Sequence, residues 1–249
     1  MSLYVYCLGD ELSESDFEGL TGVSGAAVRL LSLKGPLSAV VSAAPDEPVA
    51  VTEENLQAHN RVNAAALAVS TPLPFRFGTR AAPERLAEYA ATNEAALNGA
   101  LARVRGTVEM GVKLLSKAEG EGLKAQGGSE GGSEDLAPAE SAVGRGTAFL
   151  LKKRREALGG EEARLRAEGL AAWLAEGVAG LARESAVRVN PSEAIIVRAA
   201  HLVVRESVEE YRARLRGLRA ARADVRLLAS GPWPPYSFSD VTKQSRERS

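Results

Sequence analysis

The alternation of apolar and polar positions predicts short strands and helices from the first residues of the chain. Apolar runs at Leu3–Leu8 and Leu37–Ser42 are typical of strands, and a Gly35-Pro36 turn introduces the second run. A short helix beginning near Ser13 is expected between them. The chain is therefore predicted to open with a strand, a helix and a strand.

A longer helix is predicted from Thr52 to about Val69. Thr52 is a favourable N-cap, and the two glutamates that follow it place negative charge where the helix dipole favours it. The helix must end before Pro72, because a proline disfavours helical geometry in the residue ahead of it. The alternation in Phe75-Arg76-Phe77 then predicts another strand.

The next segments continue this pattern. Apolar residues between Leu86 and Val104 recur at helical spacing, and Thr107–Leu115 returns to a strand-like pattern. The first part of the chain therefore reads β, α, β, α, β, α, β.

Residues 117–141 differ in composition from both flanking regions. Gly, Ser and Glu dominate the segment, and no apolar period runs through it. Such a segment cannot bury enough apolar surface to offset its backbone entropy. We predict a flexible linker here.

The second half of the chain is richer in helix. Apolar residues recur at helical spacing over 151–181, although Gly159-Gly160 is expected to bend or divide this helix, because paired glycines weaken a helix interior. A buried strand over 194–204, a basic helix over 206–221 and a last strand over 224–229 follow. The order is helix, strand, helix, strand.

These elements predict an α/β fold, in the broad α+β sense, with two domains. Residues 1–116 form an N-terminal ferredoxin-like sandwich, and residues 142–238 form a helix-rich C-terminal ferredoxin-like domain. Residues 239–249 are predicted to be a disordered tail.

The composition is that of an ordinary globular protein, with 45% hydrophobic and 25% charged residues in a chain of 249. No apolar run is long enough to cross a bilayer, and the N-terminus lacks the charge pattern of a signal peptide, so we expect a cytoplasmic protein without a membrane partner. The net charge of −1 does not favour nucleic-acid binding. Cys7 lies in a strand-like run and is expected to behave as a small apolar side chain.

The chemically versatile residues do not form a catalytic or metal-binding motif. The two histidines lack the spacing of a zinc site, so no metal and no cofactor is expected. His59 lies near the apolar face of its predicted helix, where we expect a buried polar contact that holds the helix against a strand. His201, inside an apolar strand, is interpreted in the same way.

A run of four cations, Lys152, Lys153, Arg154 and Arg155, is the densest charge cluster. The simpler interpretation is a solvated helix surface, and the functional one is a docking patch for an acidic partner.

The segment Gly231–Phe238 combines three prolines with three aromatic residues. Because proline rigidity lowers the entropic cost of ordering aromatic side chains, we expect the segment to pack across the interface between the two halves. Replacement of Trp233 by Ala should then lower thermal stability. The alternative is a direct contact between these aromatic residues and a partner.

Several separated blocks, in this order, resemble the gas vesicle protein F/L family (GvpF/GvpL). The resemblance covers most of the chain outside the Gly/Ser/Glu insert, which departs from the family pattern. The blocks are Tyr4-Val5-Tyr6, Leu37–Ser42, His59-Asn60, Pro74–Thr79, Val108–Lys113, the helix opening Thr147–Arg154, and Gly231–Phe238. The motif residues within them are His59, Pro74, Phe75, Phe77, Gly78, Glu109, Lys113, Trp233, Pro235 and Tyr236.

The resemblance implies a non-enzymatic accessory or minor component of gas vesicles with two α/β domains. It implies binding to the small hydrophobic shell protein GvpA, and association with other gas vesicle accessory proteins, during nucleation and assembly. It places the protein at the gas vesicle in the cytoplasm.

Two other functions remain open from the residues alone. The fold class also suits a small-molecule-sensing or enzymatic ferredoxin-like protein, because many unrelated functions share it. A nucleic-acid binder would rest on the cations at Lys152–Arg155.

Overall fold

The structure is a computed structural model that describes residues 2–45, 47–116, 145–191 and 194–239, with the side chains of residues 116 and 145–159 outside the description. The predicted linker, 117–141, lies outside the described residues. So does the predicted tail, 239–249, except for Ser239, which the structure describes.

The first unit is built on an antiparallel sheet in the order β2-β3-β1-β4, with β5 also paired to β1. Two short 3-10 turns connect β1 to β2, and helix α1 connects β3 to β4. The chain order and the strand order are those of a ferredoxin-like unit in which the 3-10 turns replace the first helix. The elements are β1 (Leu3–Gly9), η1 (Glu14–Phe17), η2 (Val23–Gly25), β2 (Val28–Ser32), β3 (Ser38–Ala43), α1 (Glu53–Val69), β4 (Leu73–Pro74) and β5 (Arg80–Ala81).

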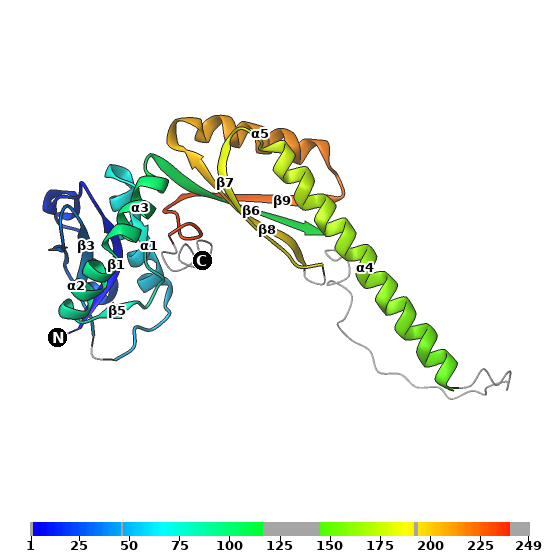
Figure 1. Ribbon diagram of the computed structural model, residues 1–249, viewed down its shortest axis with the longest axis horizontal. Helices are drawn as coiled ribbons and strands as arrows, with labels where there is room; N and C mark the ends of the chain where they lie inside the picture. The colour runs from blue at the N-terminus through cyan, green and yellow to red at the C-terminus, as the bar shows by residue number, and fades with distance from the viewer. Residues whose placement is uncertain (1, 46, 117–144, 192–193, 240–249) are drawn as a thin grey trace.

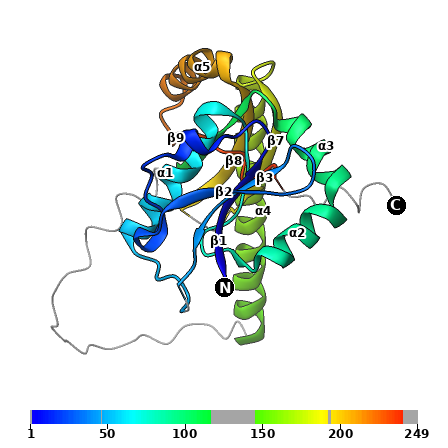
Figure 2. The ribbon, with the colours of Figure 1, turned by 90° about the vertical axis from the view of Figure 1, so that its left-hand side faces the viewer.

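Helices cover both faces of this sheet. Figure 2 shows α1 on one side of β1 and β3, and α2 (Pro83–Thr92) and α3 (Glu94–Val104) on the other side. Strand β1 is therefore buried throughout: Leu3 and Val5 face the core under α2 and α3, whereas Tyr4 and Tyr6 face the core under α1. The two tyrosines thus point toward the helix that carries His59.

Three details of the first unit differ from the sequence predictions. The helix near Ser13 is reduced to 3-10 turns, and the exposed edge strand β2 was not predicted. The strand predicted at Phe75–Phe77 lies two residues earlier, at Leu73–Pro74. A turn follows, because Gly78 adopts a left-handed conformation (φ 85°) and reverses the chain.

The second unit has the order β6, α4, β7, β8, α5, β9 and the strand order β7-β8-β6-β9, which is a complete ferredoxin-like arrangement. Helices α4 and α5 pack on one face of this sheet and share its core (Figure 1). The elements are β6 (Thr107–Ser116), α4 (Arg145–Gly177), β7 (Ala182–Val189), β8 (Ile195–Val204), η4 (Arg205–Ser207), α5 (Val208–Ala221) and β9 (Val225–Trp233).

Strand β6 is an inner strand of the second sheet, and its predicted place in the first domain, 1–116, is therefore wrong. It pairs with β8 along Thr107–Leu115 and with β9 on its other side. Strand pairing is a long-range property that a local pattern does not specify. We propose that the division between the two units falls near Gly106.

Helix α4 runs without interruption from Arg145 to Gly177, so the prediction that Gly159-Gly160 divides this helix is wrong. Glycine weakens a helix but keeps its backbone donor, and the surrounding residues favour helix. At 33 residues the helix is about 50 Å long, and its N-terminal half extends beyond the sheet (Figure 1). Among the described residues, no helix combines the length and apolar character needed to cross a bilayer.

The α+β class with two sheets, predicted from the sequence, is confirmed. The two units are joined by hydrogen bonds and apolar contacts, many of which involve the C-terminal segment Pro234–Ser239.

Candidate functional site

The residues that follow β9 cross from the second sheet onto the first unit. We call Pro234–Ser239 the strap. Pro234, Pro235 and Phe238 are buried, and the strap folds into a short turn in which the Phe238 N–H donates to the Pro235 carbonyl (3.0 Å). The rigid prolines thus hold Tyr236 and Phe238 in contact with the first unit.

Tyr236 reaches His59 on α1. The Tyr236 hydroxyl lies 3.1 Å from His59 Nε2, and Asn63 Nδ2 lies 3.1 Å from the same nitrogen. Because an amide nitrogen only donates, Nε2 is the acceptor, and the proton of the neutral ring sits on Nδ1, 3.0 Å from the Tyr4 hydroxyl. Asn63 is oriented by a second bond to the His59 carbonyl oxygen (3.1 Å).

Burial lowers the pKa of His59 to about 4, so the ring is neutral at physiological pH. Protonation would also place a second N–H against the donors that face Nε2. The ring is packed edge-on against Tyr4 and Phe77, at centroid distances of 5.8 Å and 5.7 Å. The Gly78 N–H donates to the Tyr4 hydroxyl (3.0 Å), which ties the turn after β4 to the same cluster.

Ser237 binds the carboxylate of Glu109 on β6. The Ser237 N–H donates to Oε2 (2.7 Å), and its hydroxyl donates to Oε1 (2.8 Å). Glu109 is only 9% exposed, and burial raises its pKa, whereas the two bonds from Ser237 lower it. The strap thus satisfies a buried carboxylate of the second sheet while it fills the core of the first unit.

Phe238 is buried in the core under α2 and α3, together with Leu97 and Leu101 of α3. Leu202 of β8 belongs to the same core. Arg103 Nη2 donates to the Phe238 carbonyl oxygen (3.2 Å). We call the interface between the two units the seam. It consists of a continuous apolar core with hydrogen bonds at its border.

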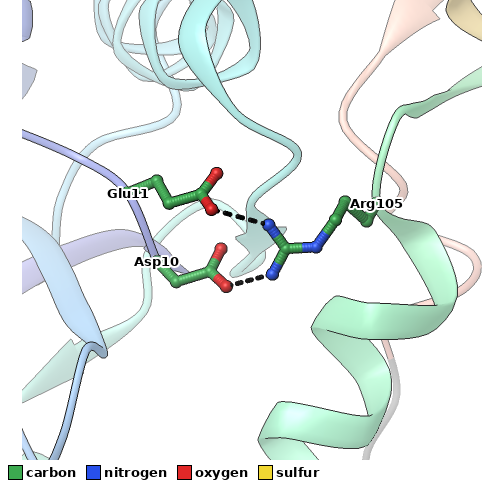
Figure 3. A network of polar contacts seen from close by, with 3 residues as sticks. All are labelled: Asp10, Glu11 and Arg105. Carbon is green, nitrogen blue, oxygen red and sulfur yellow. Dashed lines mark hydrogen bonds and ion pairs between the residues drawn. The ribbon is translucent and has the colours of Figure 1, made fainter.

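Arg105 ties the C-terminal end of α3 to the end of β1. Figure 3 shows the carboxylates of Asp10 and Glu11 facing its guanidinium from the same side. Arg105 Nη1 donates to Glu11 Oε1 (3.1 Å), and Nη2 donates to Asp10 Oδ2. Glu11 has a left-handed backbone (φ 61°), and this turn brings two consecutive carboxylates to one cation. Both bonds are charge-assisted.

Trp233 does not take part in the packing that the sequence predicted for it. It ends β9 opposite Glu109, and 42% of its surface is exposed. Tyr236 and Phe238 pack across the seam instead, because the chain turns toward the first unit only at Pro234 and Pro235, after Trp233.

The other motif residues divide between the seam and the second sheet. Pro74 pairs with Cys7, and its carbonyl accepts a long bond from Ser239 Oγ (3.5 Å). The Phe75 N–H donates to the Tyr6 carbonyl oxygen (2.8 Å), which extends the β4 pairing. Lys113 lies apart, exposed on β6.

A cleft of about 800 Å³ opens beside the seam. One wall is formed by the turn after β4 and by α3, with Leu73, Phe75 and Leu97, and the other by β7 and β8. Arg76, Arg188 and Arg198 are among the lining residues, and no described lining residue is a carboxylate. We call this the basic cleft. Its remaining lining residues are Leu8, Pro74, Thr79, Tyr89, Ala186, Val187, Ala199, Ala200, Tyr236, Ser237 and Ser239.

The reactive side chains are placed where they serve packing. Cys7 is fully buried, and burial raises the pKa of its thiol. His201 is bonded to the Tyr211 hydroxyl, and burial lowers the pKa of the imidazole to about 4. In the described part of the chain, no group of three or more His, Cys, Asp or Glu side chains is arranged to hold a metal ion.

The sequence singled out some site residues and missed others. Lys152–Arg155 lie in the first half of α4, but their side chains are outside the description. The partners Tyr4, Asn63 and Ser237 were not identified as site residues. A signal existed for Tyr4, because alternate positions of a strand buried on both faces must include one that faces α1.

These features define a protein with two ferredoxin-like units. Its strap forms hydrogen bonds with both units, and the basic cleft lies beside the strap. The chain belongs to the GvpL/GvpF family: the family model for "Gas vesicle synthesis protein GvpL/GvpF" matches residues 2–240. It is therefore a protein of gas vesicle formation.

Curated relatives carry both family designations. Gas vesicle protein F2 of Halobacterium salinarum is 26% identical, over 96% of this chain and 92% of the relative. Gas vesicle protein L2 of the same organism is 28% identical, over 95% and 90%. Gas vesicle protein L of a Streptomyces species is 27% identical, over 97% and 94%.

Crystal structures of GvpF share the fold. The protein from Anabaena aligns with a TM-score of 0.73 at 18% identity, over 96% of this chain and 98% of the other. The protein from Microcystis aeruginosa aligns with a TM-score of 0.71 at 18% identity, over 96% and 99%. The fold of this chain is thus that of experimentally determined GvpF structures.

Proposed function

We propose that this chain is a non-enzymatic accessory or minor structural protein that binds the gas vesicle shell protein GvpA and supports vesicle nucleation and assembly. The observation that carries the proposal is the family match over residues 2–240. Association with other gas vesicle accessory proteins and a place at the gas vesicle in the cytoplasm belong to the same proposal.

The physical reason for such a partner lies in the shell subunit. A subunit that buries an apolar surface only in the assembled wall is prone to aggregate beforehand. A folded partner that covers this surface would hold the subunit until nucleation. The bonds from the strap to both units support this role, because a surface that is already ordered loses little conformational freedom when it binds.

The surface that meets the shell protein has two candidates. One is the cation run Lys152–Arg155 in the extended first half of α4, and the other is the basic cleft. Both suit an acidic partner surface through charge complementarity.

Deletion of the gene in its native host, followed by electron microscopy, tests the function. We expect vesicles to be absent or few, and the wild-type gene supplied in trans to restore them. Normal vesicle number and shape in the deletion strain, with no second family member in the genome, would contradict the proposal.

A further inference from the structure

The open face of the second sheet carries cations in one row across three strands. In the strand register, Arg188 of β7 lies opposite Arg198 of β8, and Arg198 lies opposite Lys113 of β6. Residues directly opposite in an antiparallel pair point to the same face and are neighbours. Three cations therefore lie side by side on one face of the sheet.

These cations face away from the helices. Side chains alternate between the faces of a strand, and the neighbours of Lys113 and Arg198 on either side are buried in the core beneath α4 and α5. Lys113, Arg188 and Arg198 are exposed. The buried neighbours are Val112, Leu114, Val197 and Ala199.

A row of small residues separates the cations from the seam. Ala186 lies opposite Ala200, Ala200 opposite Gly111, and Gly111 opposite Ser230. Because these side chains are short, the surface between the cation row and the strap is recessed. Ala186 and Ala200 line the basic cleft, so the cleft lies over this row of small residues.

The basic cleft combines charge with apolar walls. Arg76 of the first unit and Arg188 of β7 both line the cleft, together with Phe75 and Tyr89 of the first unit. Strand β7 is an edge of the described sheet, so its outer backbone groups are open for pairing. An occupant can therefore meet cations, apolar side chains and free backbone groups together.

The distance over which the cation row extends favours a protein segment, rather than a small anion, as the occupant of the cleft. Lys113 continues the row beyond the cleft lining, two strands from Arg188. Two strand spacings are about 10 Å, which is further than one carboxylate can reach. The apolar wall also disfavours a nucleic acid, whose contacts are dominated by phosphates.

We propose that the basic cleft docks an acidic amphipathic segment of a protein partner. Its carboxylates meet Arg76, Arg188 and Arg198, and its apolar side chains lie against Phe75 and the ring of Tyr89, which are partly exposed. The inference rests on the proposed function, under which this segment belongs to the shell protein.

Two measurements on the full chain test the docking site. Fluorescein-labelled, overlapping peptides of about 20 residues that cover the shell protein are titrated by anisotropy, and intact shell protein is captured in a pull-down. The test variant is Arg76→Glu/Arg188→Glu. The matched control is Arg216→Glu/Arg219→Glu, which makes the same charge change on exposed positions of α5, behind the sheet.

We expect the binding peptides to be those with acidic residues beside apolar ones. The test variant should raise their Kd at least tenfold, and the control should leave it within twofold. The urea midpoint of each variant separates lost binding from unfolding. Should the double variant unfold, Arg188→Gln replaces it, with an expected rise in Kd of about threefold.

Three results would overturn the docking site. If the test variant binds peptides and intact shell protein as tightly as the wild type, the site is wrong while the proposed function stands. If the wild type captures no shell protein, the proposed function itself fails. If citrate or phosphate stabilises the protein through Arg188 and no peptide binds, the cleft is a small-anion site.

Discussion

The Tyr236 hydroxyl lies 3.1 Å from Nε2 of His59, a residue 177 positions earlier in the chain. This contact joins the strap to helix α1, and the neighbouring Ser237 joins the same strap to Glu109 in the second sheet. One short segment therefore bonds to both units. The stability of the two-unit arrangement should therefore depend on this segment.

Substitutions in the strap should rank by burial. Phe238→Ala removes a side chain that is 4% exposed and should cost about 3 kcal/mol of unfolding free energy. Tyr236→Phe loses one hydrogen bond and should cost about 1 kcal/mol. Trp233→Ala, at a position 42% exposed, should cost less than about 1 kcal/mol. Urea unfolding measures all three, and a larger loss for Trp233→Ala than for Phe238→Ala would contradict the ranking.

Stability should fall as the pH drops from about 6.5 to 4. Burial lowers the pKa of His59 and His201 from 6.5 to about 4, so the unfolded chain takes up protons in this window while the folded chain does not. Each histidine should contribute roughly 3 kcal/mol to the loss, which is complete below the folded pKa.

The pH prediction is checked by urea midpoints measured from pH 7.5 to pH 4. His59→Gln should be less stable than the wild type at pH 7.5, and its stability should change less on acidification. A variant with the same pH dependence as the wild type would show that His59 is not the titrating group.

Gly231 should resist substitution. Its backbone is left-handed (φ 112°), and a Cβ at this position would lie 2.8 Å from the Glu109 carbonyl oxygen. Gly231→Ala should therefore cost about 2 kcal/mol or more. Gly217→Ala is the control: it lies inside α5 with open space around it, and should stabilise the protein by up to about 1 kcal/mol. Equal effects of the two changes on thermal unfolding would refute this account.

Cys7 should be unreactive in the folded protein. The thiol is fully buried, and burial raises its pKa, so little thiolate forms and reagents cannot reach it. Ellman's reagent should modify the single thiol slowly in buffer and rapidly in urea. Rapid modification under native conditions would mean that β1 is accessible, contrary to the packing described.

The elements predicted correctly from the sequence are those marked by neighbouring residues, such as a helix cap or a continuous apolar run. Helix α1 begins after Thr52 as expected, and the Thr52 side chain accepts the Asn55 N–H (3.2 Å). The core strands β1, β3 and β8 were predicted because their apolar runs are continuous. Such signals depend only on neighbouring residues.

The missed features depend on distant residues or on exposure. The edge strands β2 and β7 were not predicted, because edge positions such as Arg183 and Arg188 face solvent and interrupt the apolar pattern. The place of β6 in the second sheet follows from its pairing with β8 and β9, which no local pattern encodes.

The candidate site was predicted only in part, for the same reason. His59, Glu109 and Tyr236 were singled out through their sequence blocks, but their partners come from other elements. The basic cleft combines Arg76 with β7, more than a hundred residues later in the chain. Only the folded chain brings them together.

Co-sedimentation of purified shell protein with this chain measures whether the two proteins bind each other. We expect shell protein to pellet when it is alone, and to stay in the supernatant as a complex when the folded chain is present at equal concentration. If the same amount of shell protein pellets with and without the chain, and no complex is found in the supernatant, the claim that this protein binds the shell subunit is contradicted.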